Sequence, residues 1–426
     1  MALPGKRLLF PRRIQVHDPD AVTTISERET DARDVGLDPG IIEEIWQAVV
    51  TYYRVGLHPA LALCIRRRGR IVLDRAIGHS HGNGPDETGV PRELATPDTL
   101  YNLYSASKCV LAMLVHQADD NGLLHLDDAV CEYIPAFGRH GKHTLTLRHV
   151  LTHRAGVPSL PGQQVDLALL ADPAAVLERL CDARLETHPG RKLAYHAVTG
   201  GFLLAAVLER VSGKDLRTLL DERIRQPLGL ETFTYGVAPD QTHRVSRSAF
   251  TGPRPPKGVA NLLEKSLGVP VEEVVRISNE PEFLAAVVPS ANIIGTPHEI
   301  GRYFECLLQE GSLDGVRVFE ARTIRRAVAE QSYHELDGVI KLPIRYGMGF
   351  MLGADHLSFY GPDTLRAFGH LGFSNVMAWA DPDRALSVAF LNTGKPILTP
   401  EVALWLRIMR VMARRIPNDG PRPVWD

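Results

Sequence analysis

The chain has 426 residues, of which 44% are hydrophobic and 23% are charged, so it is long enough to bury one large core or two closely packed domains. Its formal net charge of -2 excludes the strongly basic surface that attracts nucleic acid or an anionic membrane. No stretch approaches the roughly 20 apolar residues of a membrane-spanning helix, so we expect neither a nucleic-acid partner nor an integral membrane segment.

The cysteines are odd in number and too widely spaced for a metal or redox motif. We expect buried, unpaired thiols at Cys64, Cys109, Cys131, Cys181 and Cys306. Near the N-terminus, the apolar run Leu8-Leu9-Phe10 stops at Pro11, which is too short for the core of a signal peptide. The sequence therefore predicts a cytoplasmic protein without a metal or another cofactor.

The sequence of residues 1–77 predicts an extension, a helix and a hairpin. Residues 1–38 show no sustained period, and we interpret them as an extension that wraps over the body of the protein. A helix is predicted to begin at Asp38-Pro39-Gly40, with the aspartate as N-cap and the proline in the first turn. Residues 60–67 and 70–77 are rich in strand-forming residues and predict a hairpin. We interpret the basic run at its tip, Arg66 to Arg70, as a solvated turn rather than a phosphate site.

Two serine patterns compete for the role of nucleophile. The sequence GHSHG, at residues 78–82, has the G-x-S-x-G spacing of a nucleophile elbow, which requires a helix directly after the serine. The residues that follow Ser80 are rich in glycine and proline, so a helix is not expected there. We therefore expect Ser80 to be inactive. We also expect His79 and His81 to lie in a surface loop, because no third metal ligand is close in sequence.

The second pattern, S-x-x-K from Ser105 to Lys108, opens a stretch without proline or glycine that ends before Gly122. This stretch is apolar on nearly every side over three turns, which predicts a buried central helix. An N-capping serine and a snorkelling lysine would explain an isolated S-x-x-K pattern. In a buried helix, however, desolvation lowers the pKa of the lysine, and its free amine can accept the Ser105 proton.

Five blocks of the sequence resemble, in order, those of the serine β-lactamase and penicillin-binding protein-like superfamily. The blocks begin at Tyr101 (YNLYSASKCV), Thr146 (TLRHVLTHRAG), Pro189 (PGRKLAYHAV), Pro289 (PSANIIGTPHEIG) and Ala367 (AFGHLGFSN). The similarity covers about residues 40–415 and looks closest to the class C-like branch of esterases and transacylases.

The resemblance implies an α+β fold: an antiparallel sheet flanked by helices, with a mostly helical domain inserted. We expect the sheet domain at residues 39–104 and 286–426 and the helical domain at 105–285, with a cap at 244–288. Local patterns agree with this division. They predict strands at residues 60–77, 347–353, 375–380 and 385–392, a mainly helical stretch at 105–230 and a terminal helix at 401–414.

The resemblance also implies the roles of the site residues. Ser105 would be the acylated nucleophile, Lys108 its partner, and Tyr195 the phenol that moves protons to the leaving group. The backbone amides of Ser105 and Phe373 would form the oxyanion hole. Four further residues are implied to contact the substrate: Tyr104, His196, His370 and Gly372.

Two departures from the superfamily pattern bear on the substrate. Y-x-N has become Tyr195-His196-Ala197, which loses an amide that would hold an acyl amide. K-T-G has become His370-Leu371-Gly372 on a strand edge, which loses the permanent cation that would meet a substrate carboxylate. Both changes favour uncharged carboxylic esters. Residues 244–288, with Val339 to Ile344, would form an apolar acyl or alcohol pocket, although 244–288 could also be an ordinary surface insertion.

The leading hypothesis is a metal-free serine esterase, of the carboxylesterase or lipase kind, that acts on a small-molecule ester through an acyl-enzyme. A transacylase that moves the acyl group to an amine or alcohol is the first alternative, followed by a β-lactamase or D-amino-acid peptidase. A catalytically silent ligand sensor is the rival from another class. We interpret His149, His153 and Asp127-Asp128 as structural, and the sequence leaves the oligomeric state open.

Overall fold

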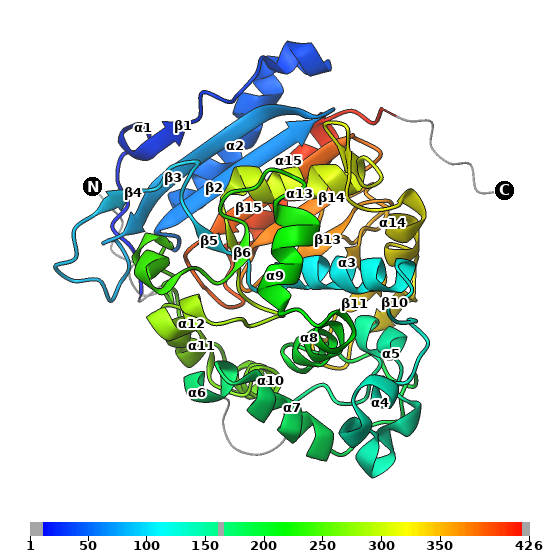
Figure 1. Ribbon diagram of the computed structural model, residues 1–426. Coiled ribbons are helices and arrows are strands. Elements are labelled where there is room, and N and C mark those ends of the chain that lie inside the picture. The colour runs from blue at the N-terminus through cyan, green and yellow to red at the C-terminus, as the bar shows by residue number, and fades with distance from the viewer. Residues whose placement is uncertain (1–11, 161–165, 420–426) are drawn as a thin grey trace.

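The computed structural model describes residues 12–160 and 166–419 (Figure 1). Within these residues, a ten-stranded antiparallel sheet has the order β1-β3-β2-β15-β14-β13-β12-β11-β10, with β4 paired to β3. Its strands are β1 (Thr23–Ile25), β2 (Ala60–Arg67), β3 (Arg70–His81), β4 (Glu93–Leu94), β10 (Ser332–Leu336), β11 (Pro343–Tyr346), β12 (Met351–Leu352), β13 (Phe368–Leu371), β14 (Met377–Asp381) and β15 (Leu386–Asn392). Both ends of the chain contribute, and the predicted fold class is confirmed.

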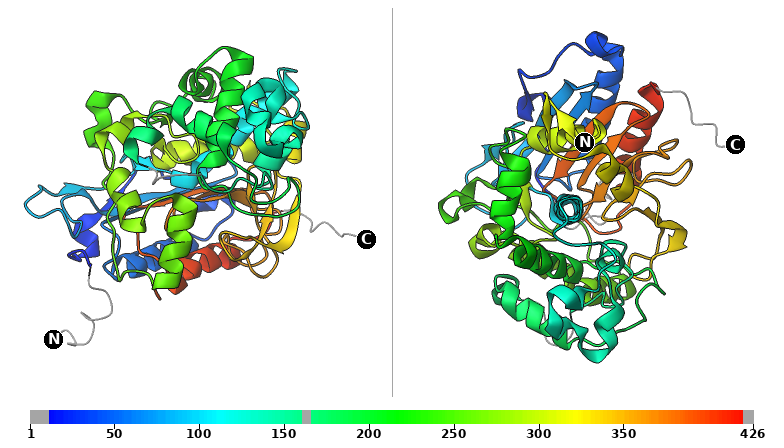
Figure 2. Two further views of the ribbon diagram at one scale, coloured as in Figure 1. Left: turned by 90° about the horizontal axis from the view of Figure 1, so that it is seen from below. Right: turned by 45° about the vertical axis from the view of Figure 1, so that its right-hand side comes forward.

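Helices cover both faces of the sheet (Figures 1 and 2). On one face, α2 (Pro39–Tyr53) and α15 (Val402–Arg415) bury the larger side chains of β2, such as Leu61 and Leu63. On the other face, α13 (Pro297–Leu308) packs against the alanines of the same strand. This alternation follows from the two-residue period of a strand. The predicted start of α2 is confirmed, because Asp38 accepts a hydrogen bond from the Gly40 amide at 2.8 Å.

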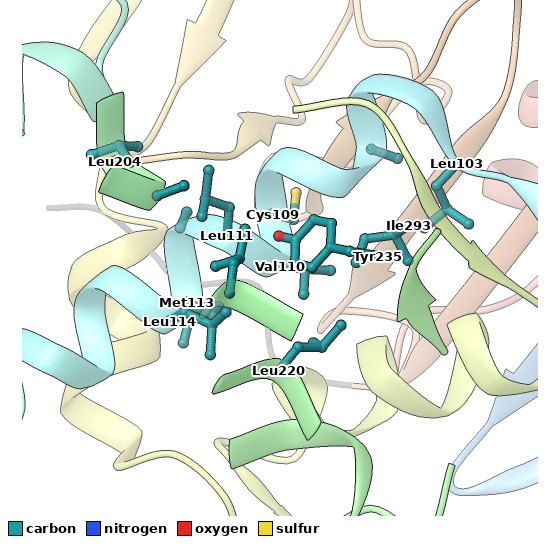
Figure 3. Packing of buried hydrophobic residues seen from close by; sticks show 14 of the residues in the cluster. Leu103, Cys109, Val110, Leu111, Met113, Leu114, Leu204, Leu220, Tyr235 and Ile293 are labelled. Carbon is teal, nitrogen blue, oxygen red and sulfur yellow. The ribbon is translucent and has the colours of Figure 1, made fainter. Parts of the chain in front are cut away.

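The central helix α3 (Ser107–Asp120) runs between the sheet and the mostly helical region and follows the short turn η3 (Tyr104–Ala106). Apolar side chains surround it on several sides (Figure 3), and its residues from Ser107 to His116 are all buried. Gly122, with a φ of 69°, lies just beyond its C-terminal end, as predicted. Because α3 is enclosed, any polar group on its inner turns is desolvated.

Shorter elements complete the fold. The remaining helices are α1 (Pro19–Val22), η2 (Ala32–Val35), α4 (Val130–Tyr133), η4 (Pro135–Thr144), α5 (Leu147–Leu151), α6 (Leu167–Leu170), α7 (Pro173–Asp182), α8 (Thr199–Ser212), α9 (Leu216–Leu220), η5 (Asp221–Arg225), η6 (Pro239–Arg244), α10 (Lys257–Leu267), α11 (Val271–Ile277), α12 (Pro281–Ala285) and α14 (Ala321–Ala327). There are two small sheets. One has the strand order β5 (Tyr101–Asn102), β7 (Ile293–Gly295) and β6 (Thr234–Tyr235), and the other pairs β8 (Ser312–Leu313) with β9 (Val316–Arg317). None of the described helices is long and apolar enough to cross a membrane.

The N-terminal segment differs from a simple wrapping extension. Residues 1–11, which contain the short apolar run considered above, lie outside the described residues. Within residues 12–38, strand β1 pairs with β3 in the register Thr23↔Ile77, so part of the extension is the edge strand of the main sheet. A three-residue strand carries too little periodicity to be recognised in sequence.

The hairpin of β2 and β3 is confirmed, and its basic run is a solvated turn in part. Arg68 and Arg70, on either side of Gly69, are exposed, whereas Arg66 and Arg67 are buried. The Arg67 guanidinium lies 2.5 Å from a carboxylate oxygen of Asp419, and that of Arg68 lies 2.7 Å from the other oxygen. The segment after α15 returns over the hairpin tip and pairs with these cations, a contact between sequence-distant residues.

Two further predictions need correction. The strand expected at residues 347–353 is interrupted, because 347–350 connect β11 to β12. Gly349 has a φ of 94° and lies so close to α3 that a Cβ would approach that of Ala112 to 2.2 Å. All five cysteines are unpaired, but Cys131 is half-buried instead of buried.

Candidate active site

The turn that carries Ser105 has an unusual backbone conformation. Tyr104, directly before the serine, has a φ of 48°, which non-glycine residues seldom adopt. Its amide donates a hydrogen bond to Asn102 Oδ1 at 2.9 Å. Its hydroxyl lies 2.6 Å from Ser248 Oγ and 3.0 Å from Ser278 Oγ. These contacts fix the left-handed residue and hold Ser105 at the wall of a cavity.

The Lys108 amine points at Ser105. Its Nζ lies 3.3 Å from Ser105 Oγ, and it also donates hydrogen bonds to the carbonyls of Ala197 at 2.8 Å and Ser290 at 3.3 Å. Burial lowers the pKa of Lys108 to about 7. Near neutral pH, a large fraction of this side chain is therefore a free amine beside a serine hydroxyl.

Tyr195 completes the group around Ser105. A hydrogen bond with Ser105 lowers the pKa of the phenol, but burial raises it by more, so the net direction is upward. The ring centroid lies 5.0 Å from Lys108 Nζ. The Tyr195 amide donates to Asp337 Oδ1 at 3.2 Å, and the same oxygen accepts from two further amides, those of Val339 and Ile340. Asp337 thus anchors the backbone that carries the phenol.

The backbone of β13 and of the turn that follows it lies against η3. A Cβ on Gly372 would come within 2.5 Å of the Leu103 carbonyl oxygen, so this close approach requires glycine. The rings of Tyr104 and Phe373 are 5.6 Å apart. Ser105 lies in the first helical turn, where amides have no intrahelical partner. Among the described residues, we find no acceptor for the Phe373 amide.

The sequence placed His370-Leu371-Gly372 on a strand edge, and the structure shows an edge there on one side. β13 lies between β12 and β14 in the sheet, but its pairing with β12 ends at Gly369, whereas its pairing with β14 continues to Leu371. The Gly372 amide donates to the Val376 carbonyl at 2.6 Å and closes the turn into β14. The Phe373 amide follows directly in this tight turn.

Two residues expected to contact substrate, His196 and His370, are buried and do not line the cavity beside Ser105. Burial is the main cause that lowers the pKa of His196 to about 4 and that of His370 to about 3. His370 Nδ1 lies 2.7 Å from the Leu371 carbonyl oxygen. His153, interpreted as structural, is also buried and accepts a hydrogen bond from the His196 amide at 3.2 Å. These three rings are neutral at pH 7 and lie near Lys108, on the side away from the cavity.

The cavity beside Ser105 has a volume of about 640 Å³ and an apolar wall. The expected substrate-contact residues Tyr104 and Gly372 line it, together with Tyr195 and Phe373. Most of the remaining wall comes from α10, α11 and two loops: Val259, Leu262, Leu263, Leu267, Val274, Ile277, Val339, Ile340, Leu342, Ile397 and Leu398. Of the lining residues, Lys341 alone carries a charge, and it is exposed.

The competing serine lies in a different setting. Ser80 is near the end of β3, no helix follows it, and its buried hydroxyl donates to the Glu93 carbonyl at 3.3 Å. His81 Nδ1 is 3.3 Å from a Glu93 carboxylate oxygen, whereas the His79 ring packs against His17. Across residues 12–160 and 166–419, no cluster of three or more histidine, cysteine, aspartate or glutamate side chains could hold a metal ion.

Several residues of the site were not singled out from the sequence, although Asn102 and Ser290 lie within blocks of the superfamily resemblance. Asp337 and Ser290 reach Tyr195 and Lys108 from segments far away in the chain. Asn102, which holds Tyr104, is one polar residue in a two-residue strand. No local period or spacing marks these positions, so only the folded chain reveals them.

Comparisons with known proteins are consistent with this geometry. The profile of the Beta-lactamase family matches residues 48–412. The protein Esterase/beta-lactamase LipL of Mycobacterium tuberculosis is 29% identical over 323 residues, which cover 72% of this chain and 71% of that protein. Among solved structures, a penicillin-binding protein homolog from Caulobacter crescentus has a TM-score of 0.74 and 27% identity, covering 89% of this chain and 98% of the other. A family VIII carboxylesterase has a TM-score of 0.74 and 26% identity, with coverage of 88% and 98%.

Proposed function

We propose that this chain, a serine hydrolase that belongs to the Beta-lactamase family, cleaves carboxylic esters with an apolar acyl or alcohol group. The observation that carries the proposal is the convergence of three side chains at one apolar cavity: Ser105, the Lys108 amine 3.3 Å from its Oγ, and the Tyr195 phenol. The substrate would be a small-molecule ester, and the intermediate would be an ester of Ser105.

In the first step, the free amine of Lys108 takes the Ser105 proton while Oγ attacks the ester carbonyl carbon. The lowered pKa of Lys108 makes this amine available near neutral pH. The carbonyl oxygen becomes an oxyanion that accepts hydrogen bonds from the Ser105 and Phe373 amides. Loss of one such donor typically costs about 3 to 4 kcal/mol of transition-state stabilisation.

Tyr195 then serves as the proton donor. Burial keeps its phenol protonated, so it gives its proton to the alkoxide as the carbon–oxygen bond breaks. The Lys108 ammonium returns a proton to the phenolate, and the alcohol leaves. Water next attacks the acyl carbon and gives a proton to the Lys108 amine. As the bond between the acyl carbon and Ser105 Oγ breaks, the Lys108 ammonium returns this proton to Oγ, which releases the acid and restores Ser105 and the free amine.

The substrate preference rests on what surrounds Ser105. The cavity wall is apolar, Ala197 offers no side-chain amide, and the lysine cation of the superfamily's K-T-G pattern is replaced by His370, which is neutral and buried outside the cavity. Together these features favour an uncharged ester over an anionic β-lactam or peptide. The names of the relatives, a family VIII carboxylesterase and an esterase/beta-lactamase, point in the same direction. The same apolar wall also favours a transacylase as the second candidate, because an apolar alcohol or amine would compete well with water there.

Intact-mass measurement tests the proposal. The protein is incubated briefly with a fluorophosphonate and, separately, with p-nitrophenyl butyrate. Ser105→Ala should abolish the adduct and the burst of p-nitrophenol, whereas the matched control Ser80→Ala should retain both, because Ser80 Oγ contacts Glu93 and His81 and does not line the cavity beside Ser105. Acceptor alcohols and amines added to the acyl-enzyme then separate a hydrolase from a transacylase. A folded wild type that shows no adduct would refute the acyl-enzyme and favour a silent ligand sensor.

A further inference from the structure

Lys395, in the segment after β15, is a second buried lysine close to the candidate site. Its side chain is fully buried, and its ammonium donates hydrogen bonds to Asn392 O and Asn392 Oδ1, both at 2.9 Å. Burial lowers the pKa of Lys395 well below its usual value. Placing an ammonium group in such a site costs stability, and none of the steps above uses it as an acid or base.

The first connection from Lys395 leads to the residue before the nucleophile. Lys395 Nζ lies over the Tyr104 ring, 4.6 Å from its centroid, where the N–H groups of an amine or an ammonium contact the aromatic face. The hydroxyl at the other end of this ring is held by Ser248 and Ser278. The ring is therefore held at its face and at its hydroxyl, and the left-handed backbone of Tyr104 directs the amide and hydroxyl of Ser105.

The second connection leads to the residue after Phe373. Asn392, which accepts both hydrogen bonds from Lys395, donates from Nδ2 to the Ser374 carbonyl at 3.0 Å. Ser374 Oγ in turn donates to the carbonyl of Pro396, the residue after Lys395, at 2.6 Å. Ser374 has a φ of 54°, so it also occupies a strained left-handed conformation that needs such support.

We propose that Lys395 is a positioning residue for the oxyanion hole: through Tyr104 and through Asn392 it fixes the neighbours of the two amides that would bind the oxyanion. The inference rests on the proposed acyl-enzyme. Ser105 and Phe373 belong to segments about 270 residues apart, and an oxyanion hole requires both amides to be preorganised. Lys395 contacts the first segment at Tyr104 and is connected to the second through Asn392, which donates to Ser374.

The test reads the polarisation of the acyl carbonyl. Wild type and Lys395→Met are acylated with an ester carrying ¹³C at the carbonyl, and the carbonyl band is isolated by infrared difference spectroscopy against the ¹²C ester. Donors in an oxyanion hole polarise the carbonyl and lower its stretching frequency. We expect the band of Lys395→Met to lie at higher frequency and to be broader, with acylation slowed roughly 10- to 100-fold and KM little changed.

Lys142 provides a matched control. It is equally buried, it donates hydrogen bonds to the carbonyls of Cys181 and Ala183, and its Nζ lies 5.2 Å from the Phe137 ring centroid, remote from Ser105. Lys142→Met makes the same change at a buried lysine as Lys395→Met does but should keep the wild-type carbonyl band and acylation rate. A general effect on stability would thus not move the spectrum.

The outcomes are distinct. A wild-type carbonyl band in acylated Lys395→Met would overturn the positioning role. If Lys395→Met does not fold, Asn392→Ala breaks the same connection to Ser374, and an unchanged band in that variant would also overturn it. If the wild type itself is not acylated on Ser105, the proposed function fails first, and this is seen in the mass spectrum before any infrared comparison.

Discussion

The rate of Ser105 acylation should follow the deprotonation of Lys108. Because the pKa of this buried amine is lowered to about 7, kcat/KM should be constant above neutral pH. It should fall tenfold per pH unit below, to roughly one hundredth of the plateau at pH 5. The assay is hydrolysis of p-nitrophenyl butyrate, followed at the isosbestic wavelength of p-nitrophenol, with the fluorophosphonate labelling rate as an independent measure. Lys108→Arg should abolish the reaction, since a guanidinium keeps its proton.

The same pKa has a consequence for stability. A fall from 10.5 to about 7 corresponds to about 5 kcal/mol at 1.36 kcal/mol per pKa unit. The folded state binds fewer protons than the unfolded state between these pH values, so this cost is complete below pH 7 and fades as the pH rises. The stability advantage of Lys108→Met over wild type, measured by urea unfolding, should therefore shrink by roughly 3 to 4 kcal/mol between pH 7 and pH 10.

Two results would refute this reasoning. A rate that is independent of pH between 5 and 9 would show that Lys108 is not the base. An acidic limb with an apparent pKa above 9 would show that the amine is solvated. The neighbouring histidines do not confuse the interpretation, because the pKa of His196 is lowered to about 4 and that of His370 to about 3.

Three further substitutions test the surroundings of Ser105. Gly372→Ala would place a Cβ 2.5 Å from a backbone oxygen, so we expect a loss of about 1 to 3 kcal/mol in urea unfolding together with reduced kcat. Leu263→Asp in the cavity wall should raise KM more for p-nitrophenyl octanoate than for the acetate, by up to about 0.8 kcal/mol per buried methylene, whereas Glu264→Gln on the exposed side of the same helix should not. Asp337→Ala removes the acceptor of three amides and should lower kcat through Tyr195 while leaving phosphonate binding before labelling unchanged.

The sequence predicted the parts of the site that are local. Ser105 and Lys108 lie one turn apart, and the apolar character of α3 alone implied that the amine would be desolvated, so their geometry followed from helix periodicity. Tyr195 was implied by the resemblance and lies where Ser105 contacts it. Asp337 and Lys395 could not be predicted, because each acts through contacts between segments that only the tertiary fold brings together.

The placement of His370 illustrates a second limit. The H-L-G sequence located the strand correctly, but side chains alternate between the two faces of a strand. Leu371 therefore lines the cavity, whereas the buried His370 ring, its centroid 6.0 Å from that of Tyr195, does not. A sequence block fixes which segment approaches the nucleophile, whereas the register of the folded sheet decides which side chain meets a substrate.

Burial shifts the pKa values of both partners of Ser105. It lowers the pKa of Lys108 and raises that of Tyr195, so at neutral pH a free amine and a protonated phenol stand beside the same hydroxyl. In the proposed mechanism, the Lys108 ammonium that forms when the amine takes the Ser105 proton is itself disfavoured by its surroundings. Its proton would therefore pass through the phenol to the leaving alkoxide. If the proposal holds, the apolar cavity favours uncharged substrates and, through the same desolvation, sets the direction of proton transfer.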